Sequence, residues 1–129
     1  MAITVGGGAD AIKRASTTYT SLFLDRAAVT TEALAQVEMQ TAGTLSRLDV
    51  HLSAAAGSGS TGYTVVVRVN GADTALTCSM VGAQSTCDEN AASVSFAAGD
   101  LVSVAAVPTV TQPTDNLDMR FTLKLTPAS

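Results

Sequence analysis

The chain has 129 residues, which suits one domain with a buried core. Only 14% of its residues are charged, the formal net charge is −4, and the largest basic cluster is Lys13-Arg14. This balance argues against a nucleic-acid-binding protein. No apolar run reaches the ~18 residues of a membrane span, and the N-terminus lacks the charged and apolar segments of a signal peptide. We therefore expect a protein made in a cytoplasm, with neither nucleic acid nor membrane as a partner.

The N-terminal segment, residues 1–14, contains the run Gly6–Gly8 and predicts a flexible arm that precedes one domain over residues 15–129. Such an arm can become ordered by docking on a neighbouring subunit or on a capsid surface. Two apolar and two basic side chains are its candidate docking residues: Ile3, Val5, Lys13 and Arg14. The alternative is a frayed terminus without a role, and the sequence leaves both possibilities open.

The next two segments carry weaker patterns. Ala15–Asp25 is rich in threonine and aromatic residues and predicts a strand. Within Asp25–Gly43, the residues Glu32–Met39 favour a helical turn by composition. We favour a loop followed by a short strand near Gln36–Thr41.

The central part of the chain alternates clearly. In the strand predicted over Thr44–Ser53, apolar residues point to one side (Leu48, Val50 and Leu52) and polar residues to the other (Arg47, Asp49 and His51). Ala54–Gly62 predicts an exposed loop and Tyr63–Val69 a second strand. Asn70-Gly71 follows, a strong signal for a two-residue hairpin turn, because both residues tolerate positive φ.

Both cysteines lie in the next segment. Strands over Thr74–Val81 and Gln84–Asp88, joined by a turn at Gly82-Ala83, form a hairpin whose register places Cys78 opposite Cys87. This arrangement predicts a disulfide, and the alternative is a pair of reduced, buried thiols. Disulfides seldom persist in a reducing cytosol but do persist on virion surfaces. The pair therefore fits a released virus particle better than a resident enzyme.

The C-terminal part predicts three more strands. Ser93–Phe96 precedes a turn at Gly99-Asp100, Leu101–Val107 follows, and Leu117–Leu125 alternates between apolar and polar residues without a break after the loop Thr109–Asn116. The total is eight or nine short strands without a convincing helix. The sequence therefore predicts an all-β fold, an antiparallel sandwich or jelly roll of about eight strands.

Reactive side chains are sparse. His51 is the only histidine, so a metal site or a Ser–His–Asp triad would depend on it, and Asp49 is its only local partner. Asp88-Glu89-Asn90 could offer oxygens to calcium, although turn chemistry explains these residues more simply. We predict no catalytic, cofactor-binding or metal-binding residue, and we expect a protein that is not an enzyme.

Several short motifs resemble the C1q/TNF-like jelly-roll family. They are Gln36–Leu52 with its Gly43-Thr-Leu, Ser93–Val104 with its Gly99-Asp-Leu-Val turn, and the closing strand Phe121–Leu125. Asn70–Cys78 together with Ser85–Cys87 looks like the version found in small tailed-phage and bacterial proteins. The resemblance covers residues 36–125 and implies a trimer of jelly rolls. Eukaryotic members usually carry more aromatic residues at the threefold axis, so the position of the axis in this chain is left unassigned.

The resemblance implies a structural role. In phages, such modules are capsid decoration (cement) proteins or the tips of fibres. We expect a homotrimer on the outer capsid surface, with the major capsid protein as its partner. The alternative is a tail-fibre tip or receptor-binding module, for which the 14 residues before the domain are a short shaft. An enzyme of the cupin or sialidase type is a third possibility, which the single histidine disfavours.

Overall fold

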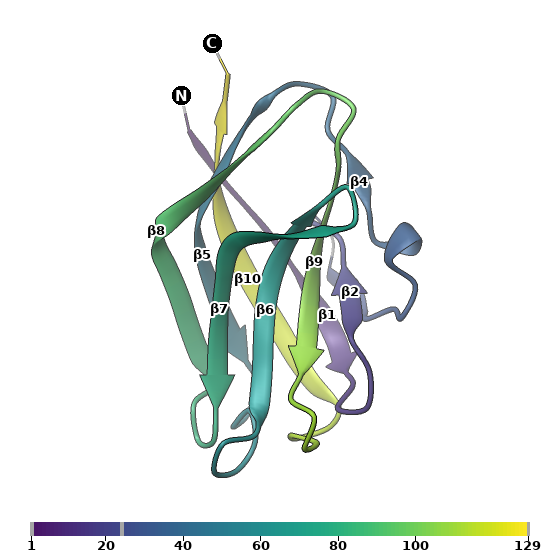
Figure 1. Cartoon of the computed structure of the whole chain (residues 1–129), viewed down its shortest axis with the longest axis vertical. Helices are drawn as coiled ribbons and strands as arrows, with labels where there is room; N and C mark the ends of the chain where they lie inside the picture. The colour runs from purple at the N-terminus through teal and green to yellow at the C-terminus, as the bar shows by residue number, and fades with distance from the viewer. Residues whose placement is uncertain (1, 24, 129) are drawn as a thin grey trace.

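The computed structural model describes residues 2–23 and 25–128, which form a sandwich of two β-sheets (Figure 1). This part of the chain contains one short 3₁₀ helix, η1 (Glu32–Leu34), and ten strands. The strands are β1 (Ile3–Ile12), β2 (Thr18–Thr20), β3 (Asp25–Ala27), β4 (Val37–Glu38), β5 (Gly43–Leu52), β6 (Gly62–Val69), β7 (Ala72–Val81), β8 (Thr86–Phe96), β9 (Leu101–Pro108) and β10 (Leu117–Pro127).

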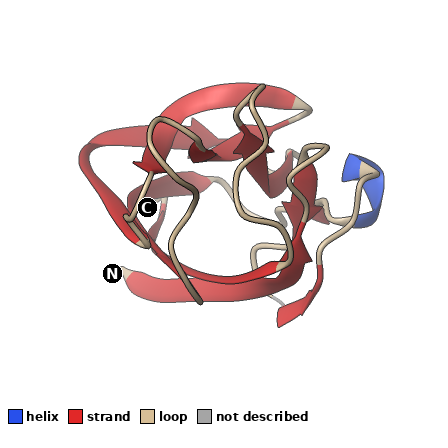
Figure 2. Ribbon diagram, turned by 90° about the horizontal axis from the view of Figure 1, so that it is seen from below, coloured by secondary structure: helices blue, strands red, loops and turns tan. Residues whose placement is uncertain are grey.

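The strand order is that of a jelly roll. Sheet A has the order β3-β1-β10-β5-β8, and sheet B has the order β2-β9-β6-β7, with β4 also paired to β9. The eight strands β1, β2 and β5 to β10 can be numbered from one to eight in chain order. In sheet A, the neighbouring strands are then the first, the eighth, the third and the sixth, in that order. Sheet B pairs the second, seventh, fourth and fifth. The all-β jelly-roll prediction is confirmed, and Figure 2 shows the two sheets facing each other with η1 projecting at one side.

Apolar residues at every second position fill the space between the sheets. On β10, the inward residues Leu117, Met119, Phe121 and Leu123 are at most 4% exposed, as the alternation predicts. On β6, Val65 and Val67 are fully buried in the same core, as is Tyr63. The Tyr63 hydroxyl donates a hydrogen bond of 2.6 Å to the carbonyl of Thr114, and burial raises its pKa to about 12.

The prediction of a flexible N-terminal arm is wrong. Residues Ile3–Ile12 form β1, which lies inside sheet A between β3 and β10, and Ile3 pairs with Leu125 near the two chain ends (Figure 1). Val5 is 8% exposed and belongs to the core, whereas Ile3 is 46% exposed. Lys13 and Arg14 are held against the loop before β10: the Lys13 ammonium donates to the Asn116 side chain at 2.5 Å, and the Arg14 backbone N–H donates to Asp115.

The predicted cysteine hairpin is also wrong, although Gly82 does occupy a turn with φ of 60°. Strand β7 pairs with β6 in sheet B, while β8 pairs with β5 in sheet A, so the chain crosses from one sheet to the other at residues 82–85. The turn bond from the Gln84 N–H to the Val81 carbonyl is present at 3.2 Å, but the hairpin ladder does not continue from it. The Val81 N–H donates to the Gln84 side chain, and the Gln84 carbonyl accepts from the Ala56 N–H.

The remaining differences are small. The strand predicted over Ala15–Asp25 is shortened to β2, and β3 begins at Asp25. Both alternatives for Asp25–Gly43 contribute, because η1 occupies Glu32–Leu34 and the short strand β4 follows. The turn at Asn70-Gly71 is confirmed, with φ values of 54° and 78°. Within the described residues, no helix has the length and apolar character needed to cross a membrane.

Candidate functional site

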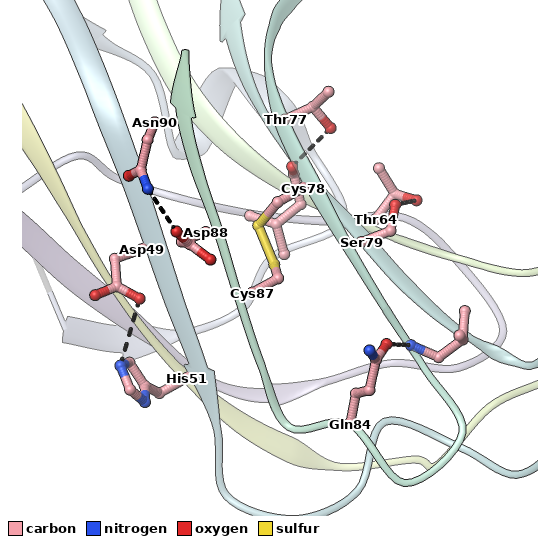
Figure 3. Close-up of a disulfide and its surroundings, with 12 residues drawn as sticks. Asp49, His51, Thr64, Thr77, Cys78, Ser79, Gln84, Cys87, Asp88 and Asn90 are labelled. Carbon is pink, nitrogen blue, oxygen red and sulfur yellow. Dashed lines mark hydrogen bonds and ion pairs between the residues drawn. A yellow bond between two sulfur atoms is a disulfide. The ribbon is translucent and has the colours of Figure 1, made fainter. Parts of the chain in front are cut away.

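The disulfide between Cys78 and Cys87 joins the edge strands of the two sheets. Cys78 lies on β7 and Cys87 on β8, and their Cα atoms are 5.9 Å apart, which is within the usual range for a disulfide (Figure 3). Both cysteines are partly buried and pack against the core. The predicted pairing is therefore confirmed, but the bond ties one sheet to the other.

The outer face of sheet A carries two adjoining open depressions, with volumes of about 500 and 570 Å³. We call them together the polar depression. It crosses β1, β10, β5 and β8, and Thr4, Asp49, His51 and Thr122 belong to both halves. Charged side chains surround them, namely Arg47, Asp88, Arg120 and Lys124.

The strand register explains which residues meet on this face. Directly paired residues of an antiparallel ladder share a face. Arg120 pairs with His51 and with Gly8, while Thr122 pairs with Asp49 and with Gly6. Towards β1, no side chain rises from the two positions that pair with Thr122 and Arg120, because both are glycines. A Cβ atom at Gly6 would overlap the carbonyl oxygen of Phe121, so this close approach of β1 to β10 requires glycine.

The acidic residues of the polar depression already have partners. Asp49 and Asp88 lie directly opposite each other on β5 and β8, a placement that by itself is unfavourable. The Asp49 carboxylate is 3.5 Å from His51 Nε2, and Asp88 accepts a hydrogen bond of 2.8 Å from the Asn90 amide (Figure 3).

The three basic side chains of the polar depression have no such partners. Arg47, Arg120 and Lys124 make no ion pair or side-chain hydrogen bond with any other residue that the structure describes. Arg47 stands at a bulge of β5, where its φ is 56°. This face therefore presents unpaired positive charge on a protein whose net charge is −4.

The outer face of sheet B holds a different charged group. The Arg68 guanidinium of β6 bonds both oxygens of Glu32 in η1, at 2.6 Å from Nε and 3.2 Å from Nη2. It also bonds Asp73 and the carbonyl of Gly71, and it lies 5.8 Å from the centre of the Tyr19 ring. We call this group the Arg68 cluster. Only 19% of the Arg68 side chain and 18% of the Glu32 side chain are exposed.

These contacts fix the charge states of the Arg68 cluster. The hydrogen bond from Arg68 lowers the pKa of the Glu32 carboxyl, and the Ser103 hydroxyl contributes by donating to the same carboxylate at 2.9 Å. The hydrogen bond to Glu32 likewise raises the pKa of Arg68. The cluster fastens η1 to the sheet, which is a structural task.

No protein-family model, curated protein or solved structure matches this chain. The interpretation of its surfaces therefore depends on the geometry described above.

His51 and the segment Asp88-Glu89-Asn90 are the two places where the sequence left a metal or catalytic site to consider, and the described residues form no such group there. His51 is exposed, and among the described residues its ion-pair partner is Asp49. Among residues 2–23 and 25–128, no three histidine, cysteine, aspartate or glutamate side chains are grouped to hold a metal ion. Asp88, Glu89 and Asn90 do not form a turn, because they lie within β8, where its register with β5 shifts. Glu89 accepts the backbone N–H groups of Ala91 and Ala92, which lowers its pKa.

The Arg68 cluster was not predicted from the sequence. Half of it follows from the predicted turn, because a two-residue turn at Asn70-Gly71 places Arg68 opposite Asp73. Glu32 is separated from Arg68 by 36 residues, and no local pattern connects them.

Proposed function

We propose that this chain is a structural protein of a virus particle, a capsid decoration (cement) protein that binds as trimers to the outer surface of a phage head and stabilises it. The observation that carries the proposal is the jelly-roll strand order. The motifs that resemble the C1q/TNF-like family lie on β5, on the turn between β8 and β9, and on β10. These are ordered parts of one sandwich, which supports the resemblance.

The disulfide adds support from its environment. A bond between Cys78 and Cys87 persists outside a reducing cytosol, as on the surface of a released particle. It ties the two sheets together at their edge, which suits a protein that must keep its shape under mechanical load.

Docking to a capsid has to use the folded surface. Residues 3–12 are committed to sheet A, and Lys13 and Arg14 are held by the loop before β10, so no free arm is available from this segment. The alternative, a tail-fibre tip or receptor-binding module, is favoured by one observation, the polar depression with its unpaired cations.

The copy number in purified particles tests the proposal. Quantitative mass spectrometry should find hundreds of copies per particle for a decoration protein, and a few copies would favour the tail-fibre alternative. Light scattering of the isolated protein should give the mass of three 13.0 kDa chains. Absence of the chain from washed particles would overturn the proposal.

A further inference from the structure

The polar depression has an ordered charge pattern along β10. Lys124 and Arg120 both point outward from this strand and are four residues apart, which corresponds to about 13 Å at the rise of an extended chain. Arg47 lines the same half of the depression as Lys124, and His51 is paired with Arg120. Each half therefore offers positive charge or hydrogen-bond donors.

The middle of the depression is acidic. Thr122, which lies between Arg120 and Lys124 on the outer side of β10, pairs with Asp49, and Asp49 pairs with Asp88 of β8. These two carboxylates are already engaged by His51 and Asn90 (Figure 3). The charged side chains of this face that remain available to another molecule are therefore cations. They are Arg47, Arg120 and Lys124, three of the chain's seven lysines and arginines.

From this pattern we infer that the polar depression binds an extended acidic segment of a partner protein. The segment carries two carboxylate side chains four residues apart, with neutral or basic residues between them. In an extended chain, such residues lie on the same side and about 13 Å apart, matching Lys124 and Arg120. The inference goes beyond the decoration role and is tested on the isolated protein, so either can fail without the other.

The acidic middle of the face favours a peptide over a nucleic acid. A phosphate backbone carries charge at every nucleotide, so some of its phosphates would lie against Asp49 and Asp88. Single-stranded nucleic acids also bind through bases stacked on aromatic side chains. The one phenylalanine, tyrosine or tryptophan at the lining is Phe121, which is only 2% exposed and points into the core, so His51 carries the one exposed ring there.

Titration of the full chain with short capped peptides, followed by ¹H–¹⁵N chemical shifts, tests the inference. The probe is a heptapeptide of serine and threonine with glutamate at its second and sixth positions. Saturable shifts are expected at amides of β5 and β10, and they should weaken as salt is raised. A peptide with glutamine at both positions should not bind, and one with its glutamates two residues apart should bind more weakly.

Matched variants locate the contact. Arg120→Gln and Lys124→Gln should each lower the affinity for the glutamate peptide by about two- to fivefold, the range for one exposed ion pair. Arg14→Gln makes the same change in charge outside the depression and should leave the affinity unchanged. Thermal unfolding checks that each variant is folded, and one folded variant of the two is sufficient for the comparison.

Three results would overturn the inference. They are equal binding of the glutamate and glutamine peptides, equal loss of affinity in Arg14→Gln and Arg120→Gln, and tighter binding of oligo-dT than of the glutamate peptide. The last result would identify the face as a nucleic-acid surface.

Discussion

The outer faces of the two sheets use arginine in opposite ways. On sheet B, Arg68 is mostly buried and bonds Glu32, Asp73 and a backbone carbonyl. On sheet A, Arg120 stands at the polar depression without an ion-pair partner among the described residues. An arginine that is held by several acceptors stabilises the fold, whereas one that is left unpaired remains available to another molecule.

What covers each face accounts for the difference. The connection between β3 and β4 carries η1, and Glu32 of η1 bonds Arg68 and the fully buried Ser103 on the outer face of sheet B. Nothing among the described residues covers the polar depression, and its β1 side carries glycines. The outer face of sheet B is thus closed by η1 where Arg68 lies, whereas the outer face of sheet A is open at the polar depression.

The largest change would come from removing the strand that borders the open face. Deletion of residues 1–14 should abolish cooperative unfolding, because it removes β1 from the interior of sheet A and takes three buried side chains from the core: Val5, Ala9 and Ile12. At about 1.5–3 kcal/mol for each large side chain, plus the lost ladder, the loss is comparable to the whole stability of a small domain. Circular dichroism during heating measures it.

Ile3→Ser is the matched control for this deletion. Ile3 belongs to the same strand but is 46% exposed, so the variant should unfold near the temperature of the unmodified protein. If the truncated protein melts cooperatively at that temperature as well, β1 is dispensable and the flexible-arm interpretation returns.

The next largest effect should come from the bond that links the two sheets. Reduction of the disulfide, or Cys78→Ser, should lower the free energy of unfolding by about 3 kcal/mol, because the bond closes a loop with a sequence separation of 9. Urea unfolding with and without reductant measures the difference. A double variant, Cys78→Ser with Cys87→Ser, should not respond to reductant, and an equal response in both proteins would show that the reductant acts elsewhere.

Exchange of the two arginines for an uncharged side chain of similar length compares the faces directly. Arg68→Met should cost about 2 kcal/mol, because it leaves the Glu32 carboxylate mostly buried with Ser103 as its remaining partner. Arg120→Met should change stability by less than about 0.5 kcal/mol. Urea unfolding of both variants gives the comparison, and equal losses would mean that the two faces do not differ in the way their contacts indicate.

Strand periodicity and turn chemistry predicted much of this fold. They did not predict which strands pair with one another. The alternation over Leu117–Leu125 identified the core side of β10, and Asn70-Gly71 identified the turn between β6 and β7. Both signals are local. Whether β7 pairs with β8 depends on which other strands offer backbone groups and apolar surface, and β5, the partner of β8, is separated from it in the sequence by both β6 and β7.

The N-terminal strand was missed for a related reason. Gly6–Gly8 is typical of flexible chain, yet Gly6 is required by the close approach of Phe121, a residue more than a hundred positions away. One signal was present. Val5 and Ala9, on either side of this run, are four residues apart, so on a strand they point to the same face, and both face the core. The candidate site divides in the same way, because the alternation of Arg47, Asp49 and His51 was visible, whereas the depression they form with Arg120 and Lys124 depends on β10 lying beside β5.

The smallest predicted effect concerns the pH dependence of the closed face. Arg68 lowers the pKa of Glu32 in the folded protein, so the ionised carboxylate stabilises the fold above its unfolded pKa, near 4.5. As the pH falls below that value and through the lowered folded pKa, the carboxylate is protonated and the contribution is lost. The stability advantage of the unmodified protein over Glu32→Gln should therefore be full at pH 7 and shrink steadily below pH of about 4.5.

Melting temperatures of the unmodified protein and of Glu32→Gln over this pH range measure the stability advantage. The control is Glu38→Gln, at an exposed position on β4, which should keep the pH dependence of the unmodified protein. A constant difference between the unmodified protein and Glu32→Gln down to pH 2 would mean that the carboxylate charge is not what holds η1 on the sheet.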